Sequence, residues 1–168
     1  MTIHMKGRAS TPPSVWRNPI HFVAFGFGAG AIKVAPGTCG TLIAIPLYIF
    51  LQDVSLLMYI LITAALFLLG VWLCQITTRD LGVHDHPGIV WDEIIGYLIT
   101  MTAAPTDILA GWMWIVLGFA LFRLFDIWKP WPINLLDRHV KGGFGVMIDD
   151  VMAGVYAWLL LHGIAISL

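Results

Sequence analysis

Residues 122–154 read FRLFDIWKPWPINLLDRHVKGGFGVMIDDVMAG, and the rest of the chain is best interpreted outward from them. Four of the nine Lys and Arg residues and four of the ten acids lie in this stretch, although only 11% of the chain is charged. Apolar runs flank it on both sides. Charges beside such runs are costly unless they meet one another, a cation or an anionic ligand. The stretch therefore predicts a water-facing site at a bilayer surface that holds a divalent metal and a phosphate.

The composition indicates an integral membrane protein. The chain has 168 residues, of which 59% are hydrophobic, and its mean hydropathy is +0.86. Soluble domains carry about 25% charged residues, more than twice the share found here. The net charge of −1 gives no reason to expect a nucleic-acid partner. We expect a flexible basic arm over residues 1–18 and a single helical membrane domain over residues 19–168.

Apolar runs predict about four to five helices and an all-α, polytopic membrane fold. Residues 42–51 and 54–76 would form a helical hairpin, and the second run is long enough to cross a hydrocarbon core of about 30 Å. Residues 92–104 and 108–125 would form two shorter helices. The pair Asp149-Asp150 would open the last helix, over residues 151–168.

A glycine-rich stretch precedes these helices. Residues 19–41 read PIHFVAFGFGAGAIKVAPGTCGT, and we expect a loop there. The pattern Gly26-x-Gly28-x-x-Ala31 matches a dinucleotide fingerprint only weakly, because the strand–turn–helix context is missing. Two interpretations remain open. The glycines can permit a tight loop and close helix packing, or their amides can form a nest for a phosphate. In the second interpretation, nearby side chains would assist, namely Lys33, Thr38 and Thr41.

The distribution of basic residues predicts the orientation. If the N-terminus lies inside, the successive crossings put all nine Lys and Arg residues on one side, and none at the turns 52–55 and 103–107. The positive-inside rule makes that side cytoplasmic. Eight of the ten acids fall on the same side, and only Asp53 and Asp107 fall on the other.

Five of these acids form the expected catalytic and metal-binding group. They are Asp92, Glu93, Asp126, Asp149 and Asp150. Converging carboxylates repel one another, and hard cations such as Mg²⁺ relieve this through oxygen ligands. Since neighbouring helical residues point about 100° apart, we expect one ligand from each adjacent pair. Two plainer interpretations are a salt-bridge cluster at helix ends and, for Asp92 and Glu93, favourable placement at a helix N-terminus.

Cations and glycines near these acids suit a phosphate. Lys129, Arg138 and Lys141 would bind anionic oxygens, and Thr38, with the backbone of Gly37 and Gly40, would line the loop opposite. The glycines that follow Lys141 would let the backbone approach the ligand closely. Metal, cations and amides together are typical of phosphoryl transfer.

The Cys-x5-Arg and Asp-x-Asp motifs are missing from the sequence, so metal-activated water is the simplest nucleophile. The segment His84-Asp85-His86 is a poor zinc signal, and we expect a surface loop there.

Three stretches resemble the phosphatidylglycerophosphatase A family. They are GFGAG…APGTCGTL at 26–42, HDH…IVWDEIIG at 84–96, and residues 122–155. The resemblance implies a Mg²⁺-dependent phosphoric monoester hydrolase of the bacterial inner membrane, with its active site facing the cytoplasm. Its lipid substrate would be phosphatidylglycerophosphate, and its products phosphatidylglycerol and phosphate. The family motifs fall on residues named above and on one further acid, Asp137.

Two other classes of protein fit parts of the pattern. Intramembrane acids and broken helices would also suit a small ion transporter or channel component. The clustering of the acids at one membrane face, away from the midplane, argues against it. A non-catalytic membrane scaffold held by surface salt bridges is the other alternative.

Overall fold

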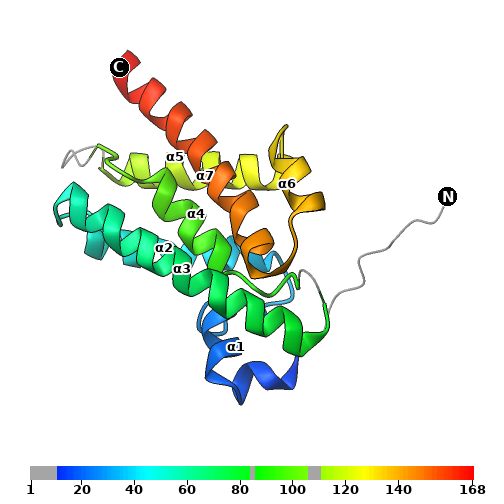
Figure 1. Cartoon of the computed structure of the whole chain (residues 1–168). Helices are drawn as coiled ribbons and strands as arrows, with labels where there is room; N and C mark the ends of the chain where they lie inside the picture. Colours follow the sequence, from blue (N-terminus) through cyan, green and yellow to red (C-terminus); the bar gives the residue numbers. More distant parts are fainter. Residues whose placement is uncertain (1–10, 84–85, 106–110) are drawn as a thin grey trace.

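The computed structural model describes residues 11–83, 86–105 and 111–168, which form an all-α fold (Figure 1). This confirms the expected fold class. Two 3-10 helices and seven α-helices occur in these residues, in the order η1 (Pro13–Trp16), α1 (Pro19–Ala24), η2 (Ala29–Ala31), α2 (Pro36–Leu51), α3 (Leu56–Leu81), α4 (Trp91–Thr100), α5 (Gly111–Trp128), α6 (Ile133–His139) and α7 (Gly142–Ser167).

Three helices are long and apolar enough to cross a membrane, namely α3, α5 and α7. Helix α2 is apolar but shorter, with 16 residues. Helix α4 has 10 residues, so it spans only about 15 Å at ~1.5 Å per residue. Ser55 caps α3 by accepting a hydrogen bond from the Met58 amide, and Gly82 ends it in a left-handed conformation.

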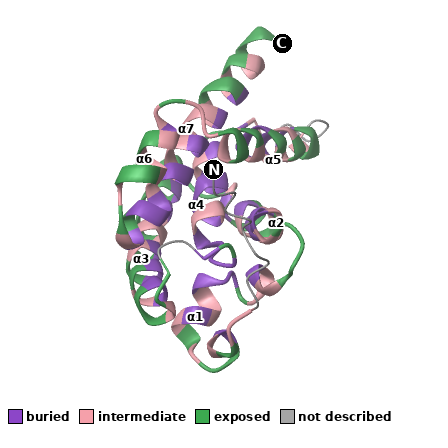
Figure 2. Cartoon of the chain, turned by 90° about the vertical axis from the view of Figure 1, so that its right-hand side faces the viewer, coloured by how far each residue is buried: buried purple, intermediate pink, exposed green. Residues whose placement is uncertain are grey.

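Helix α4 is the centre of the bundle and contacts α2, α3, α5 and α7. Seven of its ten residues are buried. Figure 2 shows buried residues on α4 and on the parts of α2 and α7 around it, whereas the outer faces of α3 and α5 are largely exposed. Such outer faces suit contact with lipid.

A pair of glycines sets the distance between α4 and α7. A Cβ added at Gly154 would lie 2.5 Å from the Gly96 carbonyl oxygen, and one at Gly96 would lie 2.8 Å from the Asp150 carbonyl oxygen. Only glycine therefore allows the two backbones to come this close. The Thr100 hydroxyl donates to the Gly96 carbonyl in the same region. This crossing brings the first turn of α4 beside Asp150 on α7.

The start of α7 differs from the prediction. The helix begins at Gly142, so Asp149 and Asp150 lie within it and are buried, instead of opening it. Of the glycines that we expected to approach a ligand, Gly145 lines the cavity described below, whereas Gly143 permits helix packing. A Cβ at Gly143 would lie 2.1 Å from the Val71 carbonyl oxygen on α3, and the Gly143 amide donates to the Gln75 side chain. A glycine run is compatible with either structure, and contact with α3 favours the helix.

The glycine-rich N-terminal stretch is also more helical than expected. It contains α1, η2 and the first turns of α2. Gly30 and Gly40 lie against the segment that leads into α4, because a Cβ would come within 1.9 Å of the Gly88 carbonyl oxygen and 2.6 Å of the Val90 side chain, respectively. Close packing, the first of our two interpretations, therefore accounts for these two glycines.

The second half of the expected N-terminal arm is packed against the bundle. Val15 in η1 is fully buried. The buried imidazole of His21 links this segment to α3, since its ring nitrogens lie 3.0 Å from the Ser14 hydroxyl and 3.3 Å from the Asp80 carboxylate. Residues 1–10 lie outside the described residues.

The ends of the helices lie in two groups, at opposite ends of the bundle. The N-terminal ends of α2, α4 and α7 meet the C-terminal end of α5 around one cavity, and α3 approaches the start of α7 there. The turn after α2 and the end of α4 lie together at the opposite end (Figure 1). We call these the site end and the far end.

Candidate active site

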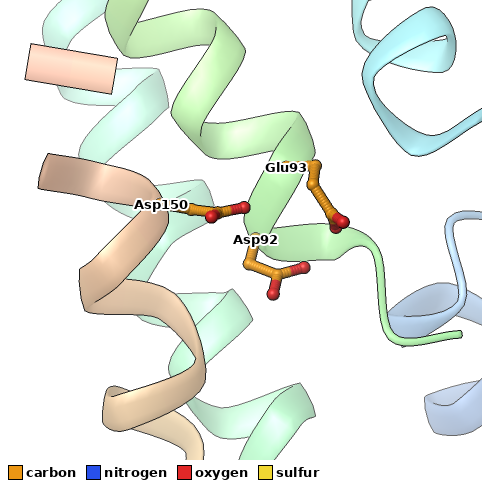
Figure 3. Close-up of side chains that lie close together, drawn as sticks. All are labelled: Asp92, Glu93 and Asp150. Carbon is orange, nitrogen blue, oxygen red and sulfur yellow. The ribbon is translucent and has the colours of Figure 1, made fainter. Parts of the chain in front are cut away.

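Three carboxylates converge where α4 meets α7. One oxygen from each of Asp92, Glu93 and Asp150 lies within 4.8 Å of the others. Figure 3 shows Asp150 reaching from α7 toward the first turn of α4, which carries the other two. The glycine crossing of α4 and α7 creates this arrangement, because Gly96 and Gly154 each lie one turn beyond these acids. The cluster has the oxygen donors that a hard divalent cation requires.

A cavity of about 730 Å³ opens beside the cluster. Six carboxylates and two side-chain cations line it, which leaves a large excess of negative charge. The charged residues are Asp92, Glu93, Arg123, Asp126, Lys129, Asp137, Asp149 and Asp150. An anionic substrate would be repelled from such a surface unless bound cations neutralised it.

Lys129 links three elements at the cavity wall. It follows α5, and its ammonium lies 2.6 Å from Asp149 on α7 and 2.7 Å from Asp137 on α6. Burial lowers the pKa of Lys129, but the two carboxylates outweigh this and raise the pKa above its usual value. Lys129 therefore stays protonated and fixes Asp149. As a result, Asp149 and Asp150 differ in role although they are neighbours.

Arg123 is the second cation of the cavity. Its guanidinium contacts Asp126 on the same helix and lies 3.8 Å from the Glu93 carboxylate. The side chain is only 15% exposed, and its buried Nε has no hydrogen-bond partner in the described residues. One Glu93 oxygen is likewise buried without a partner there. Buried polar groups are rarely unpaired in proteins, so both atoms are available to a ligand.

The N-terminus of α2 forms the opposite wall. Ala35, Pro36 and Gly37 line the cavity. Ala35 has a left-handed backbone with φ 49°, which turns the chain into the helix. A Cβ at Gly37 would lie 2.2 Å from a Glu93 oxygen, so glycine is needed here for Glu93 to reach the cluster. A helix N-terminus supplies amide donors and a positive dipole end, both of which attract anions.

The structure brings the five predicted carboxylates to one cavity. Both Asp92 and Glu93 lie in the cluster of three, whereas we expected one ligand from each adjacent pair. The longer Glu93 side chain, passing beside Gly37, removes the restriction that helical geometry imposes on neighbours. Asp126 lies close enough to Asp150 to interact with it electrostatically. Asp149 is paired with Lys129.

The four predicted phosphate-binding residues are placed differently from one another. Lys129 lines the cavity, and Thr38, Arg138 and Lys141 are not among its described lining residues. Arg138 and Lys141 are exposed on α6 and just before α7. Lys33 and Thr41, which we expected beside a phosphate-binding nest of amides, are not among the described lining residues either. Thr41 donates to the Gly37 carbonyl within α2, and Lys33 is exposed.

The expected surface loop at residues 84–86 is only partly described. His84 and Asp85 lie outside the described residues. His86 is buried and its Nδ1 accepts a hydrogen bond from the Gly88 amide. Its ring also packs against Phe25, with centroids 5.2 Å apart. His86 thus contributes to the packing between α1 and the segment before α4.

Two features of the site were missed by the sequence reasoning. No role was assigned to Arg123 from the sequence, in which it lies three residues before Asp126. The backbone of Gly37 was expected in the loop opposite the acids, and Gly37 does line the cavity, but nothing in the sequence marked it as the neighbour of Glu93. The sequence did contain a signal for Arg123. It is the first charged residue after an uncharged run of 15 residues, 108–122, and a charge beside such a run often has a function.

Comparisons with known proteins identify the family of the chain. Residues 22–165 match the family described as phosphatidylglycerophosphatase A. The chain is 47% identical over 145 residues to phosphatidylglycerophosphatase A of Escherichia coli, covering 86% of this chain and 83% of that protein. It is 49% identical over 148 residues to the protein of the same name from Haemophilus influenzae, covering 88% and 89%.

A third relative carries a different name. The chain is 40% identical over 148 residues to a putative phosphatidylinositol-3-phosphatase of Bacteroides thetaiotaomicron, covering 83% of this chain and 89% of that protein. No solved structure matches the chain. The extent of the family match, together with the two relatives that share its name, confirms the resemblance seen in the motifs: the chain belongs to the phosphatidylglycerophosphatase A family of phosphatases.

Proposed function

We propose that this protein hydrolyses the phosphomonoester of phosphatidylglycerophosphate to phosphatidylglycerol and phosphate, with Mg²⁺ as its cofactor. The observation that carries the proposal is the convergence of Asp92, Glu93 and Asp150 beside a cavity that also holds Arg123 and Lys129. Acidic residues supply metal ligands, and the two cations and the α2 N-terminus supply donors for phosphate oxygens.

The donor set fits the metal. All three converging groups are carboxylates, which Mg²⁺ prefers, and Glu93 has a buried oxygen without a partner in the described residues. Asp92, Glu93 and Asp150 would hold the ion. When bound, Mg²⁺ neutralises charge on the phosphate and makes a water molecule more acidic.

The remaining residues bind the phosphate and handle protons. Arg123 offers a planar fork of donors, suited to two phosphate oxygens. Lys129 adds a fixed positive charge. Hydrolysis gives the hydroxyl of water to phosphorus and a proton to the leaving glycerol oxygen. Asp126 and Asp149 line the cavity outside the cluster of three, so either can take up the proton of the attacking water.

We further propose that the site end faces the cytoplasm of a bacterial inner membrane. The basic residues in or beside α3, α5, α6 and α7 are at that end, namely Arg79, Arg123, Lys129, Arg138 and Lys141. The far-end residues 52–55 and 101–105 contain no Lys or Arg. Positive charge is concentrated on the cytoplasmic side of membrane proteins. Labelling of Lys141→Cys by a reagent that cannot cross the membrane should require broken cells, and labelling of intact spheroplasts would refute the orientation.

Phosphate release by the purified protein tests the activity. With phosphatidylglycerophosphate in liposomes, we expect release with Mg²⁺ and none with a chelator. Asp92→Asn should lower the rate by about 10³-fold, because charge stabilisation at the phosphoryl group is lost. Asp53→Asn is the matched control, since Asp53 is an exposed acid at the far end, and it should be as active as the wild type. Full activity of Asp92→Asn, or none in folded wild type with any metal, would refute the proposal.

A further inference from the structure

Two exposed apolar edges adjoin residues that line the cavity. One edge is the loop before α2, where Ile32 is 50% and Val34 is 76% exposed. The other is the last turn of α5, where the exposed residues are Leu124, Ile127 and Trp128. We call these five residues the apolar rim. Water is a poor environment for such a concentration of apolar side chains, so the rim calls for an apolar partner.

Both edges join the cavity wall directly. Val34 is followed by Ala35, Pro36 and Gly37, which line the cavity, and Ile127 lines it as well although it is 73% exposed. Helices α2 and α5 contact each other, so the two edges belong to neighbouring elements. A molecule that rests on the rim can therefore extend into the cavity without leaving the protein surface.

The α5 edge also continues a surface that suits lipid. Helix α5 is one of the three helices able to cross a membrane, and its exposed apolar residues extend from Trp112 and Met113 through Val116 to Ile127. The rim is thus the end of a lipid-facing stripe that reaches the cavity. On the other edge, the exposed Lys33 lies between Ile32 and Val34, where its charge suits anionic headgroups.

We propose that the apolar rim lies in the lipid leaflet and holds the diacylglycerol part of the substrate, so that the headgroup phosphate enters the cavity sideways between α2 and α5. This inference rests on the proposed phosphatase activity. It assigns to the rim residues a preference of the site for phosphomonoesters carried by membrane lipids over soluble ones. Contact with the acyl chains near the glycerol would position the phosphate beside Arg123 and the carboxylate cluster.

A kinetic comparison of two substrates tests the selectivity. The double variant Ile32→Asn/Val34→Asn removes the loop edge without adding charge and without touching a cavity-lining residue. We expect its kcat/KM for phosphatidylglycerophosphate in liposomes to fall by about tenfold, because remote binding energy is lost. Its rate on a short-chain analogue dissolved as monomers should stay within about twofold of wild type, since that substrate does not use the leaflet. Leu135→Asn on α6 is the control, an exposed apolar residue outside the rim that should leave both rates unchanged.

Lipid contact of the rim can be measured without any catalysis. Proteins with one accessible cysteine are made in a Cys39→Ser background, because Cys39 is partly exposed whereas Cys74, which is kept, is buried. A fluorophore at Val34→Cys or Ile127→Cys should be quenched by spin-labelled lipids, whereas one at Arg138→Cys, on the exposed face of α6, should be quenched by aqueous iodide. Equal iodide quenching at all three positions would overturn the proposal.

The outcomes separate this inference from the proposed function. If the double variant hydrolyses liposomal substrate as fast as wild type, the rim does not guide the lipid, while the phosphatase activity stands. If the wild type releases no phosphate from any lipid, the proposed function fails, and with it the role of the rim in selecting a substrate. The quenching result then decides whether the rim lies in the leaflet at all.

Discussion

At the site end of the bundle six carboxylates and two cations line a cavity of about 730 Å³, whereas at the far end a cavity of about 220 Å³ is lined by uncharged residues among those described. Two hydrogen bonds at the far end join aromatic side chains to backbone carbonyls. The Tyr59 hydroxyl donates to the Leu98 carbonyl at 2.7 Å, and the Trp158 indole donates to the Thr102 carbonyl at 2.9 Å. At the site end, Arg123 Nε and one Glu93 oxygen are buried without a partner in the described residues, and both belong to charged side chains that line the cavity.

This difference indicates what each end contributes. Paired polar groups stabilise the folded state, while buried polar groups left without a protein partner reduce stability unless a ligand completes them. The same helices therefore form one end whose cavity has an uncharged lining and another end whose charged cavity suits a charged ligand. Substitutions at the two ends should separate activity from stability.

The largest combined effect is expected where the two ends are joined, at the glycine crossing of α4 and α7. In Gly154→Ala the new Cβ would lie 2.5 Å from the Gly96 carbonyl oxygen, so the helices must separate. We expect a destabilisation of about 1–3 kcal/mol from overpacking. Activity should fall by about 10²-fold, because Asp150 moves away from α4. Thermal unfolding in detergent and phosphate release measure the two effects. Gly163→Ala, with no atom within 4 Å of the new Cβ, is the control; equal behaviour of both variants would contradict the role of the crossing.

Arg123→Lys should affect the site end alone. The variant keeps the positive charge beside Glu93 and Asp126 but loses the planar fork that suits two phosphate oxygens. We expect phosphate release to slow by about 10²-fold, as when one charge-stabilising donor is removed. The unfolding temperature should stay near that of wild type. Loss of folding with unchanged specific activity would instead make Arg123 a structural residue.

Gly37→Ala should give a smaller loss of activity. The added methyl group would lie 2.2 Å from a Glu93 oxygen and 3.0 Å from an Arg123 nitrogen. Glu93 must then shift, and we expect about a tenfold loss of kcat, since small misplacements of a reacting group are costly. Steady-state kinetics at saturating Mg²⁺ is the measurement. A kcat equal to that of wild type would mean that Glu93 does not need its present position.

Tyr59→Phe is the far-end counterpart and should have the smallest effect. It removes the shorter of two hydroxyl hydrogen bonds to the Leu98 carbonyl and leaves the one from Thr102, at 3.3 Å. We expect a destabilisation of about 1 kcal/mol and an unchanged rate for the folded enzyme. Unfolding in detergent and kinetics on the same preparation provide the comparison. A large loss of activity would show that the two ends are coupled.

The sequence predicts the helices better than it predicts their packing. Runs such as that in α3 identify a membrane-crossing helix because length and apolarity alone decide it. Glycine runs such as 142–145 do not reveal whether they form a loop or a closely packed helix, since that depends on a partner distant in sequence. Helix α6, between Pro132 and the glycines, was not predicted, because seven residues are too few to show a helical periodicity.

The candidate site was predicted as a set of residues and not as a geometry. The predicted orientation and the clustering of charges along the chain led us to expect the five acids at one membrane face. The sequence could not show that Asp149 would pair with Lys129 while Asp150 faces Asp92 and Glu93, because that depends on where α7 begins and where it crosses α4. Arg138 and Lys141 were expected near the phosphate because they are close to the acids in the sequence. The cations that line the cavity are instead Arg123 in α5 and Lys129 just after it.

Binding of a divalent cation by the unreacted protein tests the central claim most directly, that carboxylates from α4 and α7 form one metal site. Mn²⁺ can replace Mg²⁺ for paramagnetic resonance titrations of the wild type, Asp150→Asn and Asp53→Asn. The account predicts that wild type and Asp53→Asn bind Mn²⁺ alike, and that Asp150→Asn binds it at least about tenfold more weakly, because one ligand from α7 is lost. Equal binding by all three proteins would contradict it.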